Sequence, residues 1–338
     1  MTDGSLMQKK HFDEMLSLME GMPLQLLNAM NATEKVNLSK KLKAGNINNI
    51  LIQGMGASGV VGYVLQSMLK SKLKIPVKVS HSDGIQGFVD KKTLFIAISY
   101  SGNTTETLNA LKQAKKKKAM IVCITSGGKM AKMHKGDIVY LEQGFPPRTQ
   151  IMQMLAAGIT VLKKSGVINV KKELNDAALF MKKNIGRLKG KGKSYSKKLR
   201  DKFIIIYSGE SITAVAKRFK QQLNENTKMF THNAYFPEVN HNEIEALRFP
   251  AEKKNIAFLF IRHSHEHKET AKRMAVAKRI LKNKGRVIEI KVNRKSFVQE
   301  VIELITILDF ISYWLAVYYN EDPINLRFIP KIKEWLLK

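Results

Sequence analysis

The sequence has very little cysteine and no long apolar run. The single cysteine, Cys123, excludes a disulfide within the chain and a cysteine-ligated metal cluster. It lies in the apolar run 120–124, which predicts a buried core thiol. No stretch of about 18 apolar residues occurs, and the first 20 residues lack the basic, apolar and small-residue order of a signal peptide. We therefore expect a soluble, cytoplasmic protein.

Acidic side chains are also scarce, and most of the basic ones are lysine. The chain has 58 Lys and Arg against 28 Asp and Glu, a net charge of +30, yet only 11 of the 58 are arginine. Such an excess is typical of proteins that bind nucleic acid or anionic membranes. The lysines are scattered over the predicted helical surfaces, however, with local clusters at 115–118 and 189–198, and dispersed lysine is typical of solvated faces. We expect no specific nucleic-acid partner and no membrane, and a positive field that attracts anionic substrates.

Apolar runs and helical patterns alternate twice along the chain, which is long for one hydrophobic core. The first half predicts strands at 49–53, 76–79, 93–98, 120–124 and 137–141, and helices at 59–73, 104–117 and 150–164. The second half predicts strands at 203–207, 256–261 and 287–292, and helices at 212–223, 266–282 and 298–319. This order is typical of the α/β class, with two domains that each have a parallel sheet flanked by helices.

The predicted domains are 1–165, which begins with an N-terminal helix, and 201–338, which ends in closing helices. Between them, 166–200 is predicted to be a helical and basic connector. Its first part, 170–184, has an amphipathic helical pattern, whereas the glycines, serines and lysines of 186–202 are typical of a linker.

A glycine-rich turn, Gly54-Met55-Gly56-Ala57-Ser58-Gly59, stands between the first predicted strand and its helix. Free N–H groups and the helix dipole favour an anion at such a helix N-terminus, so Gly56, Ala57 and Ser58 are candidate phosphate ligands. A turn of this kind also holds dinucleotides, or forms a tight turn without any ligand. The turn alone therefore leaves all three interpretations open.

The second loop, Ser99-Tyr100-Ser101-Gly102-Asn103-Thr104, follows the predicted strand 93–98 and precedes a helix. Ser99, Ser101 and Thr104 bring three hydroxyls to one helix N-terminus, where hydroxyls and amides bind phosphate without a metal. Serine and threonine are also preferred helix caps, but three hydroxyls in six residues exceed what one cap requires.

The two loops carry a family resemblance. Gly54-Met55-Gly56-Ala57-Ser58 and Ser99-Tyr100-Ser101-Gly102-Asn103-Thr104-Thr105-Glu106-Thr107 resemble the loops of sugar-isomerase (SIS) domains. From about residue 49 to 338, the chain resembles the bifunctional phosphoglucose/phosphomannose isomerases of archaea and some bacteria. The resemblance implies two SIS domains, a phosphorylated hexose as substrate, and chemistry that needs no metal and no cofactor. Ala57 stands where the family usually has a second glycine, although an alanine at negative φ still donates its N–H.

An aldose–ketose isomerase needs a base that moves a proton between C1 and C2, and a cation for the enediolate oxygen. The resemblance assigns the base to Glu225, which lies between Asn224 and Asn226, and the cation to Arg148, which follows two prolines. A partly buried carboxylate fits the first task and a guanidinium fits the second. From the residues alone, Glu225 is equally an ordinary solvated carboxylate near a helix end, and Arg148 a surface arginine.

The resemblance also implies a homodimer in which His241 opens the sugar ring in the partner's active site. His241 stands among polar residues at a turn, a poor place for a core histidine, and imidazole titrates near neutral pH. The lysine that assists ring opening matches Lys333 on the closing helix, or Lys331 if the register differs.

Three histidines, His263, His265 and His267, have a spacing that resembles a metal site. Three histidines in a five-residue loop rarely close on one metal without a structured scaffold, so we predict none there.

The sequence therefore predicts an enzyme that interconverts glucose 6-phosphate, and mannose 6-phosphate as well, with fructose 6-phosphate through a cis-enediol. Two alternatives remain open. One is the isomerase half of a glucosamine-6-phosphate synthase, although the chain lacks a glutaminase domain and has His241-Asn242-Glu243 in place of a His-Gly-Pro pattern. The other is a non-catalytic SIS sugar-phosphate sensor, which would keep the Ser99 loop and lose the base.

Overall fold

The computed structural model describes residues 3–248 and 255–335, which form two compact units. Unit 1 comprises Met1–Gly21, Asn184–Asn293 and Glu303–Lys338, and unit 2 comprises Met22–Lys183 and Arg294–Ile302. The units are interleaved along the chain, whereas the predicted domains follow one another. The predicted domain ends at 1–2 and 336–338 lie outside the described residues.

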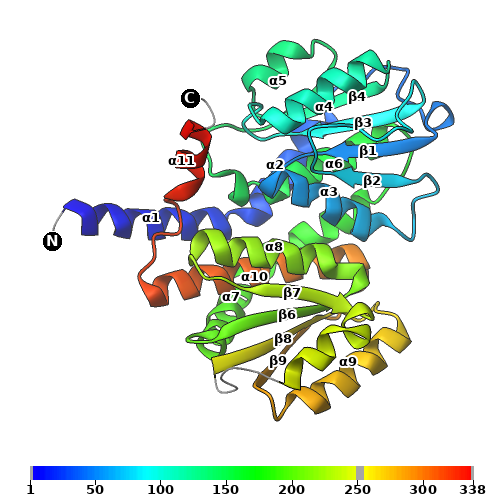
Figure 1. The fold of residues 1–338 in the computed structure, drawn as a ribbon. Helices are drawn as coiled ribbons and strands as arrows, with labels where there is room; N and C mark the ends of the chain where they lie inside the picture. Colours follow the sequence, from blue (N-terminus) through cyan, green and yellow to red (C-terminus); the bar gives the residue numbers. More distant parts are fainter. Residues whose placement is uncertain (1–2, 249–254, 336–338) are drawn as a thin grey trace. The chain divides into compact units, whose positions relative to one another are not determined.

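Unit 2 is built on a five-stranded parallel sheet with the order β2-β1-β3-β4-β5 (Figure 1). The strands are β1 (Asn49–Gln53), β2 (Val77–Ser80), β3 (Thr93–Ile98), β4 (Met120–Thr125) and β5 (Asp137–Tyr140). The helices are α2 (Met22–Glu34), α3 (Gly56–Leu69), α4 (Thr105–Lys116), α5 (Gly128–Met133) and α6 (Ile151–Lys164). Every residue of β3 is buried, as expected for a central parallel strand covered on both faces.

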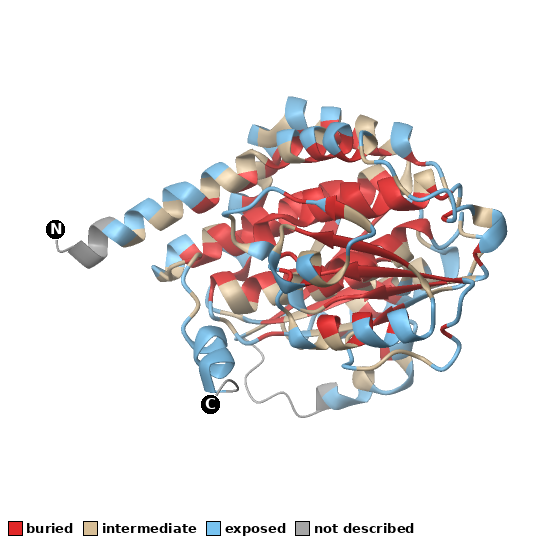
Figure 2. Ribbon diagram, turned by 90° about the horizontal axis from the view of Figure 1, so that it is seen from above, coloured by how far each residue is buried: buried red, intermediate tan, exposed pale blue. Residues whose placement is uncertain are grey.

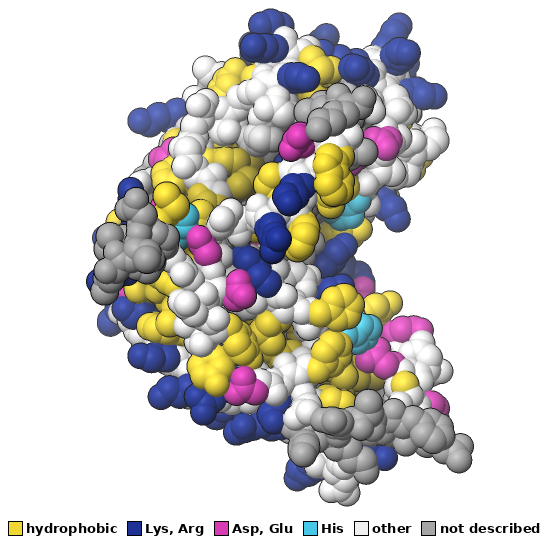
Figure 3. Space-filling model, turned by 60° about the vertical axis from the view of Figure 1, so that its left-hand side comes forward, with side chains coloured by type: hydrophobic (Ala, Val, Ile, Leu, Met, Phe, Trp, Pro, Cys, Tyr) yellow, Lys and Arg dark blue, Asp and Glu magenta, His cyan; other side chains and the backbone are white. Residues whose placement is uncertain are grey.

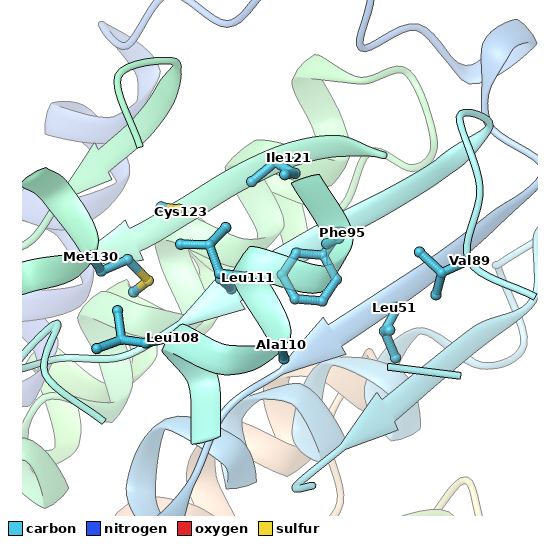
Figure 4. Close-up of a cluster of buried hydrophobic side chains, with 11 residues drawn as sticks. Leu51, Val89, Phe95, Leu108, Ala110, Leu111, Ile121, Cys123 and Met130 are labelled. Carbon is cyan, nitrogen blue, oxygen red and sulfur yellow. The ribbon is translucent and has the colours of Figure 1, made fainter. Parts of the chain in front are cut away.

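The core under α4 contains the lone cysteine. Phe95 of β3, Leu111 of α4 and Cys123 of β4 belong to one buried cluster (Figure 4). Burial raises the pKa of the Cys123 thiol to about 12, so the side chain stays protonated and behaves as a small apolar group. The prediction of a core thiol is confirmed.

Unit 1 repeats the strand order of unit 2 with one strand fewer. Its parallel sheet has the order β7-β6-β8-β9, formed by β6 (Phe203–Gly209), β7 (His232–Phe236), β8 (Ile256–Arg262) and β9 (Arg286–Lys291). Its helices include α1 (Asp3–Glu20), α8 (Thr213–Asn226), α9 (Lys268–Leu281) and α11 (Phe328–Trp335), while α7 (Lys171–Leu199) and α10 (Phe297–Tyr319) extend into both units. Figure 2 shows the strands as mostly buried. The predicted pair of similar α/β units is confirmed.

The long helix α10 is apolar enough to cross a membrane by length and composition, but 83% of its most apolar window is buried inside the protein. Such burial is typical of a core helix in a soluble protein. Its Asp309 pairs with Arg218 of α8 at 2.5 Å, and both side chains are almost fully buried.

The segment 186–202 is not the linker that its composition predicts. Helix α7 continues without a break to Leu199. Gly192 is required for packing here, because a Cβ at this position would lie 2.4 Å from the Cβ of Phe310 on α10. The glycine therefore lets two helices approach closely instead of interrupting one of them.

Helix α1 packs against the C-terminal part of unit 1. Its Gln8 side chain donates to the carbonyl of Asn320 at 2.6 Å, and His11 Nδ1 lies 2.6 Å from Asp322 Oδ2. Phe12 makes an edge-to-face contact with Tyr313, with ring centroids 6.4 Å apart. These contacts join the beginning of the chain to residues more than 300 positions away.

Candidate active site

The strand order of unit 2 brings its two candidate phosphate loops together. β1 pairs with β2 on one side and β3 on the other, so the order along the sheet reverses at β1 and β3. Ligands bind at such a switch point, beyond the carboxyl ends of the strands. The N–H of Tyr100, in the loop after β3, donates to Ser58 Oγ, in the turn after β1, at 3.2 Å.

The hydroxyls of the Ser99 loop face one another. Ser99 Oγ lies 3.1 Å from Thr104 Oγ1. Thr104 occupies the N-cap position of α4 in an extended conformation, but its side chain makes no capping hydrogen bond. Ser101 is exposed at the turn, where its hydroxyl accepts from the N–H of Asn103 at 3.3 Å. Ser99 and Thr104 are thus in direct contact, Ser58 contacts the backbone of the same loop, and Ser101 lies at its edge.

The Ser99 loop is held by direct backbone packing. Gly102 has φ +65°, and a Cβ there would lie 1.8 Å from the carbonyl oxygen of Gly127. The carbonyl of Gly102 accepts from the N–H of Met130 at 2.8 Å, and Asn103 Oδ1 accepts from the N–H of Lys129 at 2.9 Å. The loop is therefore fixed against α5 by its own sequence, which reduces the ordering that a ligand would have to impose.

The glycine-rich turn starts α3 at Gly56, whose φ of +51° favours glycine. Ala57 is helical and so has negative φ, as its expected role as an N–H donor requires. Gly59 also allows a close approach, because a Cβ there would lie 2.2 Å from the ring of His81. The amides of Gly56 and Ala57 thus stand at the positive end of a helix, next to Ser58.

Arg148 is not a surface arginine. It lies in the short 3₁₀ helix η2 (Pro147–Thr149), which contacts α3, and is only 3% exposed. The segment before it is tied to the Ser99 loop by Tyr100, whose hydroxyl donates to the carbonyl of Glu142 at 2.8 Å and accepts from the N–H of Phe145 at 3.2 Å. Burial of a guanidinium requires polar partners, which favours a specific role over a solvated one.

Glu225 lies half-buried in the last turn of α8 in unit 1. Its flanking asparagines anchor the helix end: Asn226 donates to Ser312 Oγ of α10 at 2.9 Å, and Asn224 donates to the carbonyl of Met229 at 2.7 Å. These contacts hold the backbone that carries Glu225.

Lys228, which lies two residues after the end of α8, holds the same helix end. Its ammonium donates to the carbonyls of Glu225 at 2.7 Å, Asp322 at 2.7 Å and Asn325 at 2.9 Å. It thereby ties the last turn of α8 to the segment that precedes α11. No local pattern in the sequence pointed to this lysine.

His241 is exposed at the end of the 3₁₀ helix η4 (Glu238–His241). The loop around it is anchored by Glu243, which accepts from the Tyr207 hydroxyl at 2.8 Å and lies 3.1 Å from His232 Nε2. Burial and the adjacent Glu243 carboxylate raise the pKa of Tyr207, which therefore donates a proton to this hydrogen bond at neutral pH. Sequence reasoning missed Tyr207 and His232, because they reach Glu243 only through the tertiary fold.

Lys331 and Lys333 both lie exposed on α11, two positions apart and hence on different sides of the helix. The register alternative between them stays open. The histidines with metal-like spacing have contacts within unit 1. His263 Nε2 lies 2.8 Å from Ser211 Oγ, and His267 caps α9 by accepting from the N–H of Glu269.

Comparisons with known proteins identify the family of the chain. Residues 45–138 match the SIS domain family, and residues 188–336 match the bacterial phospho-glucose isomerase C-terminal SIS domain. The bifunctional phosphoglucose/phosphomannose isomerase of Thermoplasma volcanium is 32% identical over 89% of this chain and 95% of its own length. The chain belongs to this family.

Two further relatives and one solved structure are similar to most of the chain. The enzyme of the same name from Caldicellulosiruptor bescii is 34% identical over 89% of this chain and 93% of its own, and a D-glucosamine-6-phosphate 4-epimerase of Sulfolobus acidocaldarius is 29% identical over 83% and 87%. A putative phosphosugar isomerase structure from Clostridium difficile superposes with a TM-score of 0.75 at 16% identity over 94% of this chain and 97% of its own. That likeness supports the two-unit SIS fold alone.

Proposed function

We propose that this phosphosugar isomerase interconverts glucose 6-phosphate, and also mannose 6-phosphate, with fructose 6-phosphate through a cis-enediol. The named activities of relatives at 32% to 34% identity support these substrates. The structural observation that carries the proposal is the Ser99–Thr104 hydroxyl pair, in which the N-cap threonine leaves its helix uncapped. We assign the phosphate to the hydroxyls of Ser58, Ser99, Ser101 and Thr104 and to the amides of Gly56 and Ala57.

The proposed chemistry uses four further side chains. The Glu225 carboxylate removes the proton from C2 of the open-chain aldose while O1 gains a proton, which gives the enediol. It then returns the proton to C1 while O2 loses its own, which gives the ketose. The Arg148 guanidinium stabilises the enediolate oxygen. Ring opening transfers the proton of the C1 hydroxyl to the ring oxygen, and we assign this step to His241 with Lys333.

We also propose a homodimer in which each chain supplies His241 to its partner's site. The exposed apolar side chains of α11 support this proposal, since Phe328 and Trp335 are each 66% exposed. Analytical ultracentrifugation measures the assembly state, and Glu225→Gln chains mixed with His241→Ala chains should regain part of the activity. An active monomer would rule out the shared site.

The test of the proposed function is direct. Purified protein is mixed with fructose 6-phosphate, and glucose 6-phosphate is measured with a coupled dehydrogenase; mannose 6-phosphate is tested in a parallel reaction. Deuterium from solvent should appear at C2 of the recovered glucose 6-phosphate, because an enediol exchanges its proton and a hydride shift does not. Fructose 6-phosphate binding without turnover would favour a sensor, and turnover of glucosamine 6-phosphate alone would favour amino-sugar chemistry.

A further inference from the structure

Unit 2 contains a groove that the proposed chemistry does not use. It has a volume of about 740 Å³ and lies where the strands begin: its lining includes Asn46 just before β1, Lys92 just before β3, Lys118 just before β4, and Asp137 at the start of β5. The Ser99 loop follows the opposite, carboxyl end of β3. A strand of six residues spans about 20 Å, so the groove lies at the amino ends of the strands and the phosphate loops lie at their carboxyl ends.

Five lysines from three separate segments line this groove. Lys41 comes from the segment before β1, Lys91 and Lys92 from the turn before β3, and Lys115 and Lys118 from the end of α4. The acidic side chain in the lining is Asp137, whose Oδ1 accepts from the N–H of Ser39 at 2.6 Å. The five lysines and one aspartate give the lining a net formal charge of +4.

This convergence differs from the general scatter of lysine. Figure 3 shows Lys and Arg side chains spread over the face in view, as the sequence predicts for solvated helix surfaces. In the groove, cations from segments about 25 to 50 positions apart in the chain line one concave surface. A concave surface with one sign of charge concentrates the electrostatic field and attracts an oppositely charged ligand.

Two of the lysine-bearing segments have defined backbones. The turn with Lys91 and Lys92 is closed by the N–H of Thr93, which donates to the carbonyl of Asp90 at 3.1 Å, and by Asp90 Oδ1, which accepts from the N–H of Lys92 at 2.8 Å. Lys118 has φ +57°, at a helix C-terminus where glycine is the favoured residue. A lysine at this position has a backbone cost that glycine would not have, and its side chain lines the groove.

We propose that this groove binds a small molecule that carries two or more phosphate groups. A phosphate monoester contributes about −1.5 to −2 charges near neutral pH, so two or three such groups match the charge of the lining. The volume is that of a ligand pocket. Lysine ammonium groups suit the oxygens of a flexible polyphosphate, because they bind it as point charges without a fixed geometry.

The lining disfavours nucleic acid and hexose monophosphate as occupants. Among the lining residues, which all belong to the described part of the chain, there is no phenylalanine, tyrosine, tryptophan or arginine. Stacking of bases on a protein surface depends on those side chains. A monophosphate would leave at least two lysine charges unmatched.

The test measures binding by isothermal titration calorimetry with the full chain. Inorganic tripolyphosphate, ATP and fructose 1,6-bisphosphate are the probes, and they separate a polyphosphate chain, a nucleotide and a sugar bisphosphate; AMP is the monophosphate control. We expect one site per chain for at least one probe, with affinity that falls as salt rises. The double variant Lys92→Ala/Lys118→Ala should lower the affinity for that probe by about tenfold or more, because two charged contacts are lost. The matched control is Lys182→Ala/Lys183→Ala, on the exposed face of α7, which should change the affinity by less than about twofold.

The outcomes separate this groove from the proposed active site. Saturating fructose 6-phosphate should leave tripolyphosphate binding intact, and Lys92→Ala/Lys118→Ala should keep the isomerase activity. Equal losses in the groove and control variants would show a general charge effect and overturn the proposal, as would displacement by fructose 6-phosphate or the absence of binding by all three probes. Tight binding of single-stranded RNA that depends on the groove lysines would assign the surface to nucleic acid instead. The measurements that decide the proposal are the binding titrations, so a failure of the isomerase assay would not affect it.

Discussion

The loop after β3 in unit 2 and the loop after β8 in unit 1 hold the same place in two sheets of the same strand order, but they use their polar groups differently (Figure 1). In unit 1, His267 caps α9 by accepting from the N–H of Glu269, and Arg262 pairs with Glu266 and with Glu289. In unit 2, Thr104 stands at the N-cap of α4 without a capping bond and faces Ser99.

The difference shows that two sheets of the same strand order can carry loops with different polar contacts. In the unit 1 loop, an ion pair and a helix cap engage Arg262, Glu266 and His267, whereas in the unit 2 loop hydroxyls come together at a helix N-terminus. The proposed function implies a division of labour, in which unit 2 holds the phosphate and unit 1 carries the proposed base, Glu225. The predictions below test that division, from the largest expected effect to the smallest.

The largest effect should come from Glu225→Gln. Glutamine keeps the shape and cannot accept a proton, so kcat should fall by roughly 10² to 10⁴, with KM nearly unchanged. Steady-state kinetics with fructose 6-phosphate measures both constants. Glu14→Gln, on the exposed face of α1, is the matched control and should behave as wild type. Full turnover in Glu225→Gln would transfer the base to another residue and leave the phosphate loops unaffected.

The next effect concerns stability and not chemistry. Arg218→Met leaves the carboxylate of Asp309 buried without its guanidinium partner, which should lower the free energy of unfolding by about 3 to 5 kcal/mol. Lys163→Met is the comparison in unit 2, because it removes a partly exposed pair with Glu34 and should cost at most about 1 kcal/mol. Urea denaturation measures both values. Similar losses in the two variants would contradict the assignment of Arg218–Asp309 as a structural pair of the unit 1 core.

Substrate affinity should separate the two loops. Thr104→Ala and Ser101→Ala each remove a hydrogen bond that the proposed function assigns to the charged phosphate, so KM should rise by about tenfold to a hundredfold. Ser264→Ala, in the unit 1 loop, is the matched control, since its hydroxyl contacts His265 Nδ1 at 3.3 Å and should leave KM unchanged. If Ser264→Ala raised KM as much as Thr104→Ala, the division of labour would be wrong.

The smallest effect is a pH dependence of the unit 1 ion pairs. Burial alone would raise the pKa of Glu289, but the hydrogen bonds and charges of Lys278 and Arg262 outweigh it and hold that pKa below its usual 4.5. A lowered carboxyl pKa contributes stability that is complete above the unfolded-state pKa and is lost as the pH falls through the folded-state value. Glu289→Gln should therefore show a smaller loss of melting temperature than wild type when the pH falls from 7 to below 4.5. Parallel curves for the two proteins would show that this pair contributes nothing.

Most elements could be predicted because their apolar periodicity is local. β1 and β3 begin and end at the predicted residues, since buried parallel strands are continuous apolar runs. β7 was missed, because only Phe236 of its five residues is buried and the strand lies at a sheet edge. The end of α7 was misread, since the need for Gly192 depends on Phe310 of a distant helix.

The same contrast between local patterns and long-range contacts applies to the candidate site. The Ser99 loop could be recognised because its hydroxyls lie within six residues of each other and directly before a helix. The contacts that hold Glu225 and His241 could not, since Lys228 reaches Asp322 and Asn325 across more than 90 positions, and Tyr207 reaches Glu243 across 36. Sequence patterns give the residues of a loop, but not the long-range hydrogen bonds that fix its neighbours.

The contacts of α1 have a consequence for the order in which the protein is made. Gln8 and His11 bind partners at 320 and 322, so during synthesis this helix leaves the ribosome about 300 residues ahead of the surface that it covers. At about 5 to 20 residues per second, that interval lasts roughly 15 to 60 seconds. Residues 22–183 of unit 2 can assemble during this time, whereas the 294–302 segment of unit 2 and the last helices of unit 1 emerge only near its end. A fragment cut after residue 183 would therefore keep an N-terminal helix whose binding surface has been removed.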